Sequence, residues 1–370
     1  MSSEARHRYC RCRSVVFCAI PSSLAFRSNL GNQNERFRKA FSVVEDAIRA
    51  RAFPGASVAV LYRDELVAEC GFGHFIYDDA TSSDVMADTV FDLASVSKVV
   101  ATTTMAAILY ERGSLDLDAT VPGRADLTIR SLLTHTSGFP AYIKLFEQTG
   151  DCRELLRLAY ATPLEAAPGS RTEYSDIGFI ILGDILENVA GEPLNRFCQR
   201  EIFEPLGMDH TFFCPPPEKR HLIAPTRDDH YFRHKLIQGE VNDENAWVMN
   251  GVAGHAGVFS TAYDVAVFAD CWLSGGAPIL KRETVAEFTR PQPDTTRALG
   301  WDRPTPPSSS GQYFSPSSFG HLGYTGTSLW CDPEKQLAVV LLTNRTWPDA
   351  KNQAIKQIRP AFHDAIFEAL

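Results

Sequence analysis

The sequence has little positive charge for its length. Its 36 lysine and arginine residues face 45 aspartate and glutamate residues, which gives a formal net charge of -9, and no basic patch follows residue 40. Such a chain repels a phosphate backbone, so we expect no nucleic-acid partner. Long apolar runs are also missing, because beyond the N-terminal segment no stretch approaches the length of a membrane span.

Cysteine pairs of the metal-binding or redox kind are absent. The nine cysteines are scattered and odd in number, and no two of them form a C-x-x-C motif. We expect most of them to be reduced, buried, small apolar residues. So many unpaired thiols favour a cytoplasmic location, because an oxidising compartment would pair them wrongly.

The N-terminal segment keeps export open as an alternative. Arginines at positions 6, 8, 11 and 13 precede an apolar stretch from Val15 to Phe26 that resembles a short signal peptide, although Pro21, Ser22 and Ser23 interrupt it. A disordered extension, or residues added by an upstream start codon, would give the same pattern. We treat residues 1–33 as an N-terminal extension and 34–370 as the folded domain.

Strand signals lie towards the two ends of the domain, and helix signals lie between them. Hydrophobic residues make up 44% of the chain and charged residues 22%, which is typical of a soluble globular protein. Periodicity predicts a helix over 35–52, a β-hairpin from 57–62 and 66–72, two strands at 327–331 and 337–343, and a final helix over 349–370. Residues 96–205 are mainly helical in pattern, including 178–189 with an end at Gly191, and 214–246 and 304–318 are irregular.

These patterns predict a mixed fold of the α+β type. We expect an antiparallel sheet flanked by helices, with an inserted, mostly helical lobe. The sheet lobe would take about 34–95 and 250–370, and the helical lobe about 96–249.

Ser95, Val96, Ser97 and Lys98 form the only S-x-x-K in the chain, at the start of an apolar helix that Gly113 ends. Positions i and i+3 share a helix face, so Lys98 would reach the Ser95 hydroxyl. A serine needs such a base near neutral pH, and burial lowers the pKa of a lysine into the range for this work. Taken alone, the motif equally fits a surface serine and a lysine whose head extends into water.

Several motifs in the right order resemble the β-lactamase-related serine hydrolases, which include class C-type β-lactamases, D-alanyl-D-alanine carboxypeptidases, esterases and amidases. FDLASVSK at 91–98 is similar to the family's nucleophile motif, and GSLDLDATV at 113–121 and LLTHTSGFP at 132–140 are similar to the stretches that follow it. IQGEVNDENAW at 237–247 and GVAGHAGVFSTA at 251–262 resemble a subgroup with amidases and peptidases that act on cell-wall fragments. The resemblance implies a β-lactamase/transpeptidase-like fold for nearly the whole domain.

The resemblance also implies most of the remaining site. Tyr174 begins a triplet that matches the family's Y-x-N, with Asp176 in place of Asn, and would complete the proton relay. GHLGYTGTSLW at 320–330 matches the strand that carries K-T-G, with His321 in place of the lysine. The backbone amides of Ser95 and Tyr324 would form the oxyanion hole.

Other residues carry open alternatives. Asp176 would pair with Lys98, accept a substrate amide hydrogen, or cap the next helix. His321 would orient a substrate carboxylate or carbonyl through a pKa near neutrality. Gly323 would let the strand approach the substrate or simply bend it. His255 lies in a small-residue loop that would approach the ligand, and His135 would stabilise the loop behind the site.

We therefore predict a serine hydrolase that acts through an acyl-enzyme without a cofactor or a catalytic metal. A cell-wall-derived peptide or amide is the first substrate class, followed by esters and then β-lactams. The alternative from another functional class is a homologue that binds a ligand without catalysing a reaction. We expect a small-molecule or peptide substrate as the partner, no membrane span, and a monomer.

Overall fold

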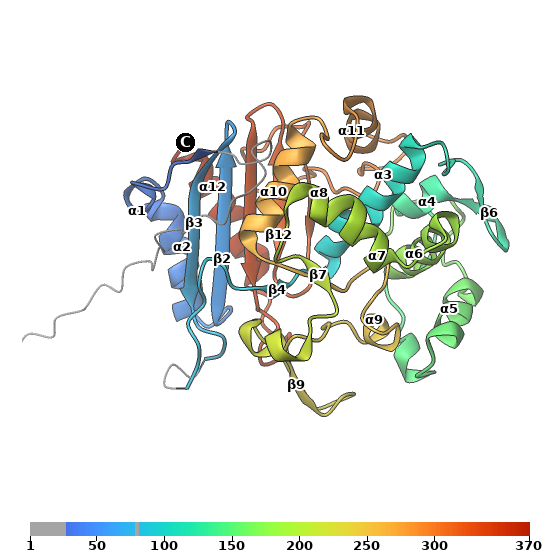
Figure 1. Ribbon diagram of the computed structural model, residues 1–370, viewed down its shortest axis with the longest axis horizontal. Coiled ribbons are helices and arrows are strands. Elements are labelled where there is room, and N and C mark those ends of the chain that lie inside the picture. The colour runs from blue at the N-terminus through green and yellow to red at the C-terminus, as the bar shows by residue number, and fades with distance from the viewer. Residues whose placement is uncertain (1–26, 78–80) are drawn as a thin grey trace, which may run out of the picture.

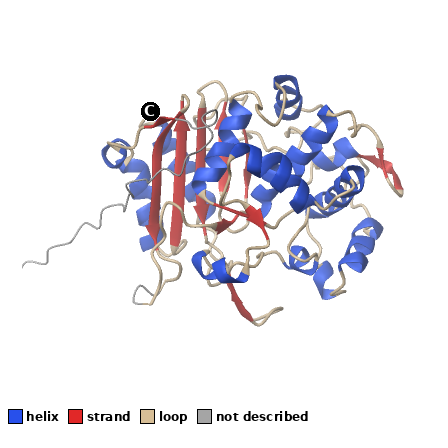
Figure 2. Cartoon of the chain, in the orientation of Figure 1, coloured by secondary structure: helices blue, strands red, loops and turns tan. Residues whose placement is uncertain are grey.

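The computed structural model describes residues 27–77 and 81–370, so the signal-like segment and Cys10, Cys12 and Cys18 lie outside the described residues. Its centre is a six-stranded sheet in the order β1-β3-β2-β13-β12-β11, antiparallel except for the short β1–β3 pair (Figures 1 and 2). The strands are β1 (Arg27–Ser28), β2 (Gly55–Tyr62), β3 (Glu65–Gly73), β11 (Phe319–Leu322), β12 (Ser328–Asp332) and β13 (Leu337–Thr343). The mixed, antiparallel-rich fold that the sequence predicts is confirmed.

The predicted hairpin at the start of the domain is present as β2 and β3. The two residues between the strands, Arg63 and Asp64, have φ angles of 52° and 61°. Positive φ at both central residues is the geometry of the two-residue turns that match the twist of a hairpin. The polar residues Arg63 and Asp64 are therefore the turn of the hairpin.

The two faces of the sheet enter different hydrophobic clusters. Val58 and Val60 of β2 pack with helices α2 (Arg38–Arg49) and α12 (Ile355–Phe367) on one face. Ala59 and Leu61 point the other way, into the larger cluster that includes α10 (Ala262–Leu273). This alternation follows from the period of two in a strand. Figure 1 shows α10 in front of the sheet and α2 and α12 behind it.

The larger cluster continues from the sheet into the helical part of the molecule. Helix α6 (Asp176–Ala190) is its centre, with seven buried apolar residues that face neighbours on every side. The chain around it forms η1 (Ala94–Val96), η2 (Lys98–Thr103), α3 (Thr104–Glu111), α4 (Ile129–Leu133), η3 (Leu145–Glu147), α5 (Cys152–Ala161), α7 (Leu194–Cys198), η4 (Gln199–Phe203) and α8 (Glu204–Leu206). None of the helices in the described ranges combines the length and apolarity needed to cross a bilayer.

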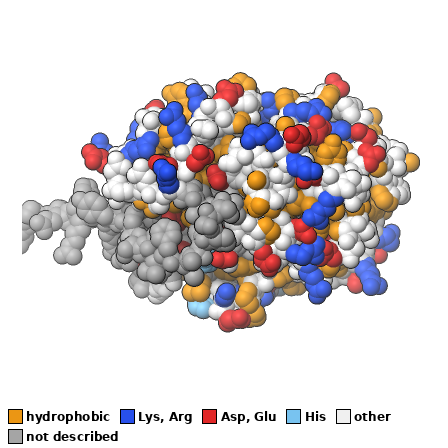
Figure 3. Space-filling model, turned by 45° about the horizontal axis from the view of Figure 1, so that its top comes forward, with side chains coloured by type: hydrophobic (Ala, Val, Ile, Leu, Met, Phe, Trp, Pro, Cys, Tyr) orange, Lys and Arg blue, Asp and Glu red, His pale blue; other side chains and the backbone are white. Residues whose placement is uncertain are grey.

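Short elements connect these parts and line the region between them. Three small sheets contain β4 (Phe91–Asp92) with β10 (Val258–Ser260) and β7 (Phe212–Phe213), β5 (Thr120–Val121) with β6 (Arg124–Thr128), and β8 (Arg227–Asp229) with β9 (Lys235–Ile237). The remaining helices are α1 (Gln33–Arg36), η5 (Pro217–Leu222), α9 (Glu244–Val248) and α11 (Arg282–Thr289). Acidic and basic side chains are interspersed over the visible face in Figure 3.

Three sequence-based expectations differ from the structure in detail. The first helix is broken at Phe37, and the last begins at Ile355 rather than at 349. The start is delayed because the guanidinium of Arg345 donates to the carbonyls of Ala350 and Asn352, which holds that segment as a loop. Among the described cysteines, Cys214 is a free thiol that is exposed rather than buried.

Candidate active site

Ser95 lies on a strained turn between β4 and the buried helix η2–α3. The preceding residue, Ala94, has a φ of 47°, a conformation that costs free energy in any residue with a Cβ and is common at functional sites. Asp92 holds this turn, because its two carboxylate oxygens accept from the backbone N–H of Ala94 at 2.8 Å and of Asn242 at 2.6 Å. Burial raises the pKa of Asp92 to about 6.

Lys98 is fully buried and its Nζ contacts three acceptors. The distances from Nζ are 2.9 Å to Ser95 Oγ, 2.6 Å to Asp176 Oδ1 and 3.0 Å to the carbonyl oxygen of His255. A protonated ammonium donates to all three. A neutral amine donates to Asp176 and His255, which leaves its lone pair for the Ser95 hydroxyl hydrogen.

The surroundings of Lys98 shift its protonation equilibrium towards the neutral amine. Burial lowers the pKa of Lys98, and this effect outweighs the opposite effect of the Asp176 carboxylate. The predicted i, i+3 contact between Lys98 and Ser95 is therefore present, and the lysine is not a surface residue. The geometry is that of a serine with an adjacent base.

Ser175 caps helix α6 and places its two neighbours in the site. Its hydroxyl accepts from the Gly178 N–H at 3.2 Å and donates to the Pro140 carbonyl at 2.7 Å. Because Ser175 is the cap, Asp176 is free to pair with Lys98, so the capping alternative for Asp176 is wrong. Tyr174 precedes the cap, and its ring centre lies 4.9 Å from Lys98 Nζ.

Tyr174 stays a neutral phenol in this setting. Burial and the Asp176 carboxylate raise its pKa well above the ordinary value, although a hydrogen bond to Ser95 and the charge of Arg297 act in the opposite direction. Tyr174 and Ser95 border the same pocket, and Lys98 contacts Ser95 and lies over the Tyr174 ring, so the three side chains converge. These pKa shifts leave more of Lys98 as the free amine, and less of Tyr174 as the phenolate, than the same groups would have in water.

His321 of β11 does not titrate near neutrality, contrary to our expectation. Burial and the positive charges of Lys98 and Arg297 lower its pKa well below 6.5. Its Nδ1 lies 2.8 Å from the carbonyl oxygen of Leu322, which can only accept, so Nδ1 carries the proton. The ring is therefore a neutral group whose Nε2 is an acceptor, rather than a cation in the place of the family's lysine.

The turn between β11 and β12 is fastened to the nucleophile segment. Thr325 and Thr327 donate their hydroxyls to the carbonyls of Asp92 and Leu93, each at 2.8 Å. A Cβ on Gly323 would lie 1.9 Å from the Thr327 hydroxyl and 2.5 Å from the Leu93 carbonyl oxygen. This glycine is thus required for strand packing against the nucleophile segment. The arrangement brings Tyr324 and Ser95 to the same pocket.

His255 is buried beside Lys98 and forms a pair with Asp243. Its Nε2 lies 2.7 Å from Asp243 Oδ1, and its own carbonyl oxygen is the third contact of Lys98. Burial would raise the pKa of Asp243, but His255, the Ala246 N–H and Lys98 lower it overall. A Cβ on Gly254 would lie 2.1 Å from the carbonyl oxygen of Phe179, so only glycine lets this loop approach α6.

His135 lies behind the site, as the sequence suggests. Its Nδ1 accepts from the N–H of Ser175 at 3.0 Å, and its ring stacks between Tyr174 and Phe179 at centroid distances of 4.7 Å and 5.0 Å. Burial lowers its pKa well below 6.5, so it is neutral. Such contacts fit a positioning residue rather than an acid or base.

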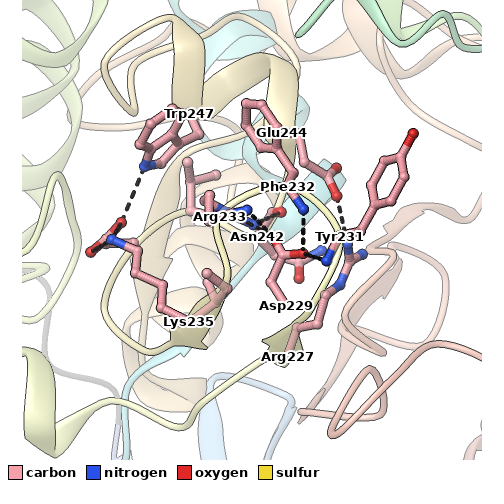
Figure 4. Close-up of polar contacts among 12 residues, drawn as sticks. Arg227, Asp229, Tyr231, Phe232, Arg233, Lys235, Asn242, Glu244 and Trp247 are labelled. Atoms are coloured by element: carbon pink, nitrogen blue, oxygen red, sulfur yellow. Dashed lines mark hydrogen bonds and ion pairs between the residues drawn. The ribbon is translucent and has the colours of Figure 1, made fainter. Parts of the chain in front are cut away.

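The β8–β9 hairpin forms another wall of the site and is internally braced (Figure 4). Asp229 and Arg233 are both 1% exposed and form an ion pair at 3.1 Å. The Arg233 guanidinium also donates to the carbonyls of Val241 at 2.6 Å and Asn242 at 2.8 Å. Since the N–H of Asn242 binds Asp92, the hairpin is connected to the turn that holds Ser95.

A cavity of about 770 Å³ is bordered by Ser95, Tyr174, Tyr324 and other residues of the site. It brings together every side chain that the sequence proposes for substrate contact, including His255, and Lys98 lies beneath it. Asp92, Asp243 and Arg297 were missed by sequence reasoning. Asp243 lies in the IQGEVNDENAW motif at 237–247, whereas nothing in the sequence indicates that Arg297 belongs to the site. Within residues 27–77 and 81–370, no group of three or more His, Cys, Asp and Glu side chains is placed to hold a metal ion.

Solved structures of similar architecture cover nearly the whole chain. A beta-lactamase from Mycobacterium bovis is 25% identical, with a TM-score of 0.60, and the match covers 87% of this chain and 97% of that protein. EstCE1, a hydrolase with promiscuous acyltransferase activity, is 21% identical, with a TM-score of 0.74 and coverage of 90% and 99%. At 21% identity the latter shows the fold alone.

Sequence relatives give the family. A protein of Salmonella agona named "Putative D-alanyl-D-alanine carboxypeptidase" is 32% identical, and one of the same name from Salmonella typhi is 33% identical, each over 92% of this chain and 88% of the relative. Residues 41–361 match the family described as Beta-lactamase. The chain therefore belongs to the beta-lactamase family of serine hydrolases.

Proposed function

We propose that the protein cleaves an amide or ester through an acyl-enzyme, with Ser95 as nucleophile, Lys98 as base and Tyr174 as proton relay. The observation that carries this proposal is the buried Lys98 amine, 2.9 Å from Ser95 Oγ and held by two further acceptors. The lowered pKa of Lys98 and the raised pKa of Tyr174 support this division of roles.

In the first half-reaction, Ser95 Oγ attacks the substrate carbonyl carbon while its proton passes to Lys98 Nζ. The carbonyl electron pair moves to the oxygen, and the backbone amides of Ser95 and Tyr324 would stabilise that charge. As the tetrahedral intermediate collapses, Tyr174 gives its proton to the leaving nitrogen or oxygen and regains one from Lys98. An ester of Ser95 and a free amine or alcohol result.

In the second half-reaction, water attacks the ester carbonyl and the same groups move the protons in reverse order. Water loses a proton to the relay, the carbon–Oγ bond breaks, and Ser95 regains its hydrogen. The acid is released and the enzyme returns to its starting state. This cycle needs no group beyond the side chains named.

For the substrate, we propose a cell-wall-derived peptide or amide, with carboxypeptidase or amidase activity. The names of the Salmonella relatives support this class. Carboxylester hydrolysis is the second candidate, favoured by the neutral His321 where other family members place a cation. A weak β-lactamase activity comes third, and a catalytically silent binding protein is the rival of another class.

A fluorophosphonate probe followed by mass spectrometry tests the mechanism. We expect a single label on Ser95 in the wild type, no label in Ser95→Ala, and a fall in turnover of roughly 10³-fold or more in that variant. Its melting temperature should stay close to that of the wild type. Ser114→Ala, which changes an exposed serine, is the control and should label normally. A wild type that resists labelling would support the silent homologue instead.

A further inference from the structure

Arg359 of helix α12 is a buried arginine at the edge of the active-site cavity. Its residue is only 6% exposed, and it is among those that border the cavity. Within residues 27–77 and 81–370, no carboxylate forms an ion pair with its guanidinium. Burial and the charge of Arg345 lower its pKa to about 9, so it is still a cation near neutral pH. A buried cation without a counterion costs free energy, and the proposed mechanism gives it no role.

The guanidinium of Arg359 donates to two carbonyl oxygens of the turn between β11 and β12. Its Nη2 lies 2.8 Å from the carbonyl oxygen of Gly323 and 2.8 Å from that of Thr327. Each of these oxygens already has a backbone donor. The Gly326 N–H donates to Gly323 at 3.1 Å, and the Gly323 N–H donates to Thr327 at 2.8 Å. The turn therefore does not need Arg359 to satisfy its carbonyl groups.

The Gly323 carbonyl belongs to the same peptide group as the N–H of Tyr324. The C=O and N–H of a planar trans peptide point in opposite directions, so this N–H points away from the guanidinium. Among the backbone hydrogen bonds of the described residues, none is donated by the Tyr324 N–H. Tyr324 borders the cavity together with Ser95. The N–H is thus available to a substrate oxygen, as the proposed oxyanion hole requires.

Arg345 holds the other side of Tyr324. Its Nε donates to the Tyr324 carbonyl at 2.7 Å, and its backbone N–H donates to the Thr325 carbonyl at 2.9 Å. Its guanidinium carbon also lies 4.6 Å from the centre of the Tyr324 ring. The peptide groups before and after Tyr324 are therefore each bound to an arginine. This arrangement fixes the direction of the Tyr324 N–H before any substrate binds.

A cation at a carbonyl oxygen also strengthens the N–H at the other end of the same peptide group. It draws electron density towards the oxygen through the delocalised C–N bond, which leaves the N–H more positive. Such a donor gains most when its acceptor is charged. The substrate carbonyl is neutral, whereas the transition state carries negative charge on the oxygen. The stronger donor therefore stabilises the transition state more than the bound substrate.

We propose that Arg359 is a positioning residue of the oxyanion hole, which orients and polarises the Gly323–Tyr324 peptide group so that its N–H binds the developing negative charge. The inference rests on the proposed acyl transfer, which places this charge at Tyr324. Arg359 contacts no reacting atom and acts through the peptide group alone. Sequence reasoning named the Tyr324 amide but not the cation behind it.

Labelling of Ser95 by a neutral ethyl fluorophosphonate tests this role, because the phosphoryl oxygen takes the place of the carbonyl oxygen. Arg359→Gln keeps a donor for the Gly323 carbonyl but removes the charge, whereas Arg359→Lys keeps both. We expect the second-order rate constant to fall by roughly 10-fold in Arg359→Gln, which is less than the cost of losing a whole oxyanion donor. It should stay closer to the wild-type value in Arg359→Lys. Arg359→Met is the second neutral variant if Arg359→Gln does not fold.

Phosphorus NMR of the stable adduct separates polarisation from a general loss of structure. The chemical shift of the folded adduct, minus that of the same adduct after denaturation, reports the hydrogen bonds to the phosphoryl oxygen. We expect this difference to shrink in Arg359→Gln and to persist in Arg359→Lys. A purely structural role would affect the melting temperature without this dependence on charge.

Lys356→Gln is the matched control, because it removes an exposed cation from the same helix at the same cavity. It should label at the wild-type rate. Equal labelling rates in Arg359→Gln and Arg359→Lys, an unchanged NMR difference in Arg359→Gln, or equal slowing by Lys356→Gln would each overturn the role of Arg359. A wild type that does not label at Ser95 would overturn the proposed function itself, whereas a labelled wild type with insensitive variants refutes only the role of Arg359.

Discussion

At the scale of single residues, burial decides the chemistry of the site more than residue type does. Lys98 and Asp176 form an ion pair in which the lysine is fully buried, and removal of the ammonium from water lowers its pKa despite the carboxylate. The same burial keeps Tyr174 protonated and His321 and His135 neutral. Lys98 is therefore the group whose deprotonation would control activity.

The pH dependence of kcat/KM on a neutral ester tests this role. A base acts only when deprotonated, so activity should rise with pH through an ionisation below 10.5, the ordinary lysine value. Asp176→Asn removes an interaction that raises the pKa of Lys98, so the rising limb should move to lower pH. Lys98→Arg should abolish activity, because a guanidinium does not deprotonate.

Asp126→Asn, which changes an exposed carboxylate far from Lys98, is the control for that profile and should leave it in place. A shift of the Asp176→Asn profile to higher pH would contradict the assignment of Lys98 as the base. So would retention of wild-type activity by Lys98→Arg.

At the scale of elements, short segments that look irregular in sequence hold the nucleophile in place. The β8–β9 hairpin is braced by the Asp229–Arg233 pair, and Arg233 continues the contact to Asn242 and hence to Asp92. Asp92 accepts from Ala94, the strained residue before Ser95. A hairpin remote in sequence thus contributes to the geometry of the nucleophile turn.

Arg233→Met should destabilise the protein by about 3 kcal/mol or more, because it leaves the buried Asp229 carboxylate without its cation. Lys235→Gln removes an exposed ion pair with Glu240 in the same hairpin and should cost less than about 1 kcal/mol. Urea unfolding of the two variants gives the comparison. Equal losses would show that the internal pair does not brace the hairpin.

At the scale of the whole molecule, one hydrophobic cluster joins the sheet to the helices. It contains Ala59 and Val340 from the strands and Ile180 from the centre of α6. The active-site cavity lies between these parts, with Ser95 from the start of a helix and His321 from a strand. We propose that residues 34–370 form a single domain of two lobes, as the sequence analysis expects.

A single domain of this kind should unfold in one cooperative transition. Trp330 lies in the cluster behind the sheet, whereas Trp272 and Trp301 lie in the larger cluster, so tryptophan fluorescence reports on both faces. We expect thermal curves from fluorescence and from far-ultraviolet circular dichroism to coincide. Two separated transitions would show that the lobes are independent domains.

The sequence by itself determined the features that depend on neighbours along the chain. The period of two in β2 and β13, the turn at Arg63 and Asp64, and the i, i+3 spacing of Ser95 and Lys98 all follow from local backbone geometry. The order of the motifs was enough to predict the family and several of the residues that line the pocket, among them Ser95, Tyr174 and His321.

Only the tertiary structure decided which partner each of these groups has and which charge it carries. Ser175 caps helix α6, so the Asp176 carboxylate pairs with Lys98 instead. The Leu322 carbonyl accepts from His321 Nδ1 and so determines the tautomer of that ring. Arg297 lines the pocket from a loop, and nothing in the sequence indicates this position. The physical reason is that desolvation and Coulomb interactions depend on distance through space. Lys98 lies 78 residues from Asp176 and 157 residues from His255 in the sequence, so no local pattern records these contacts.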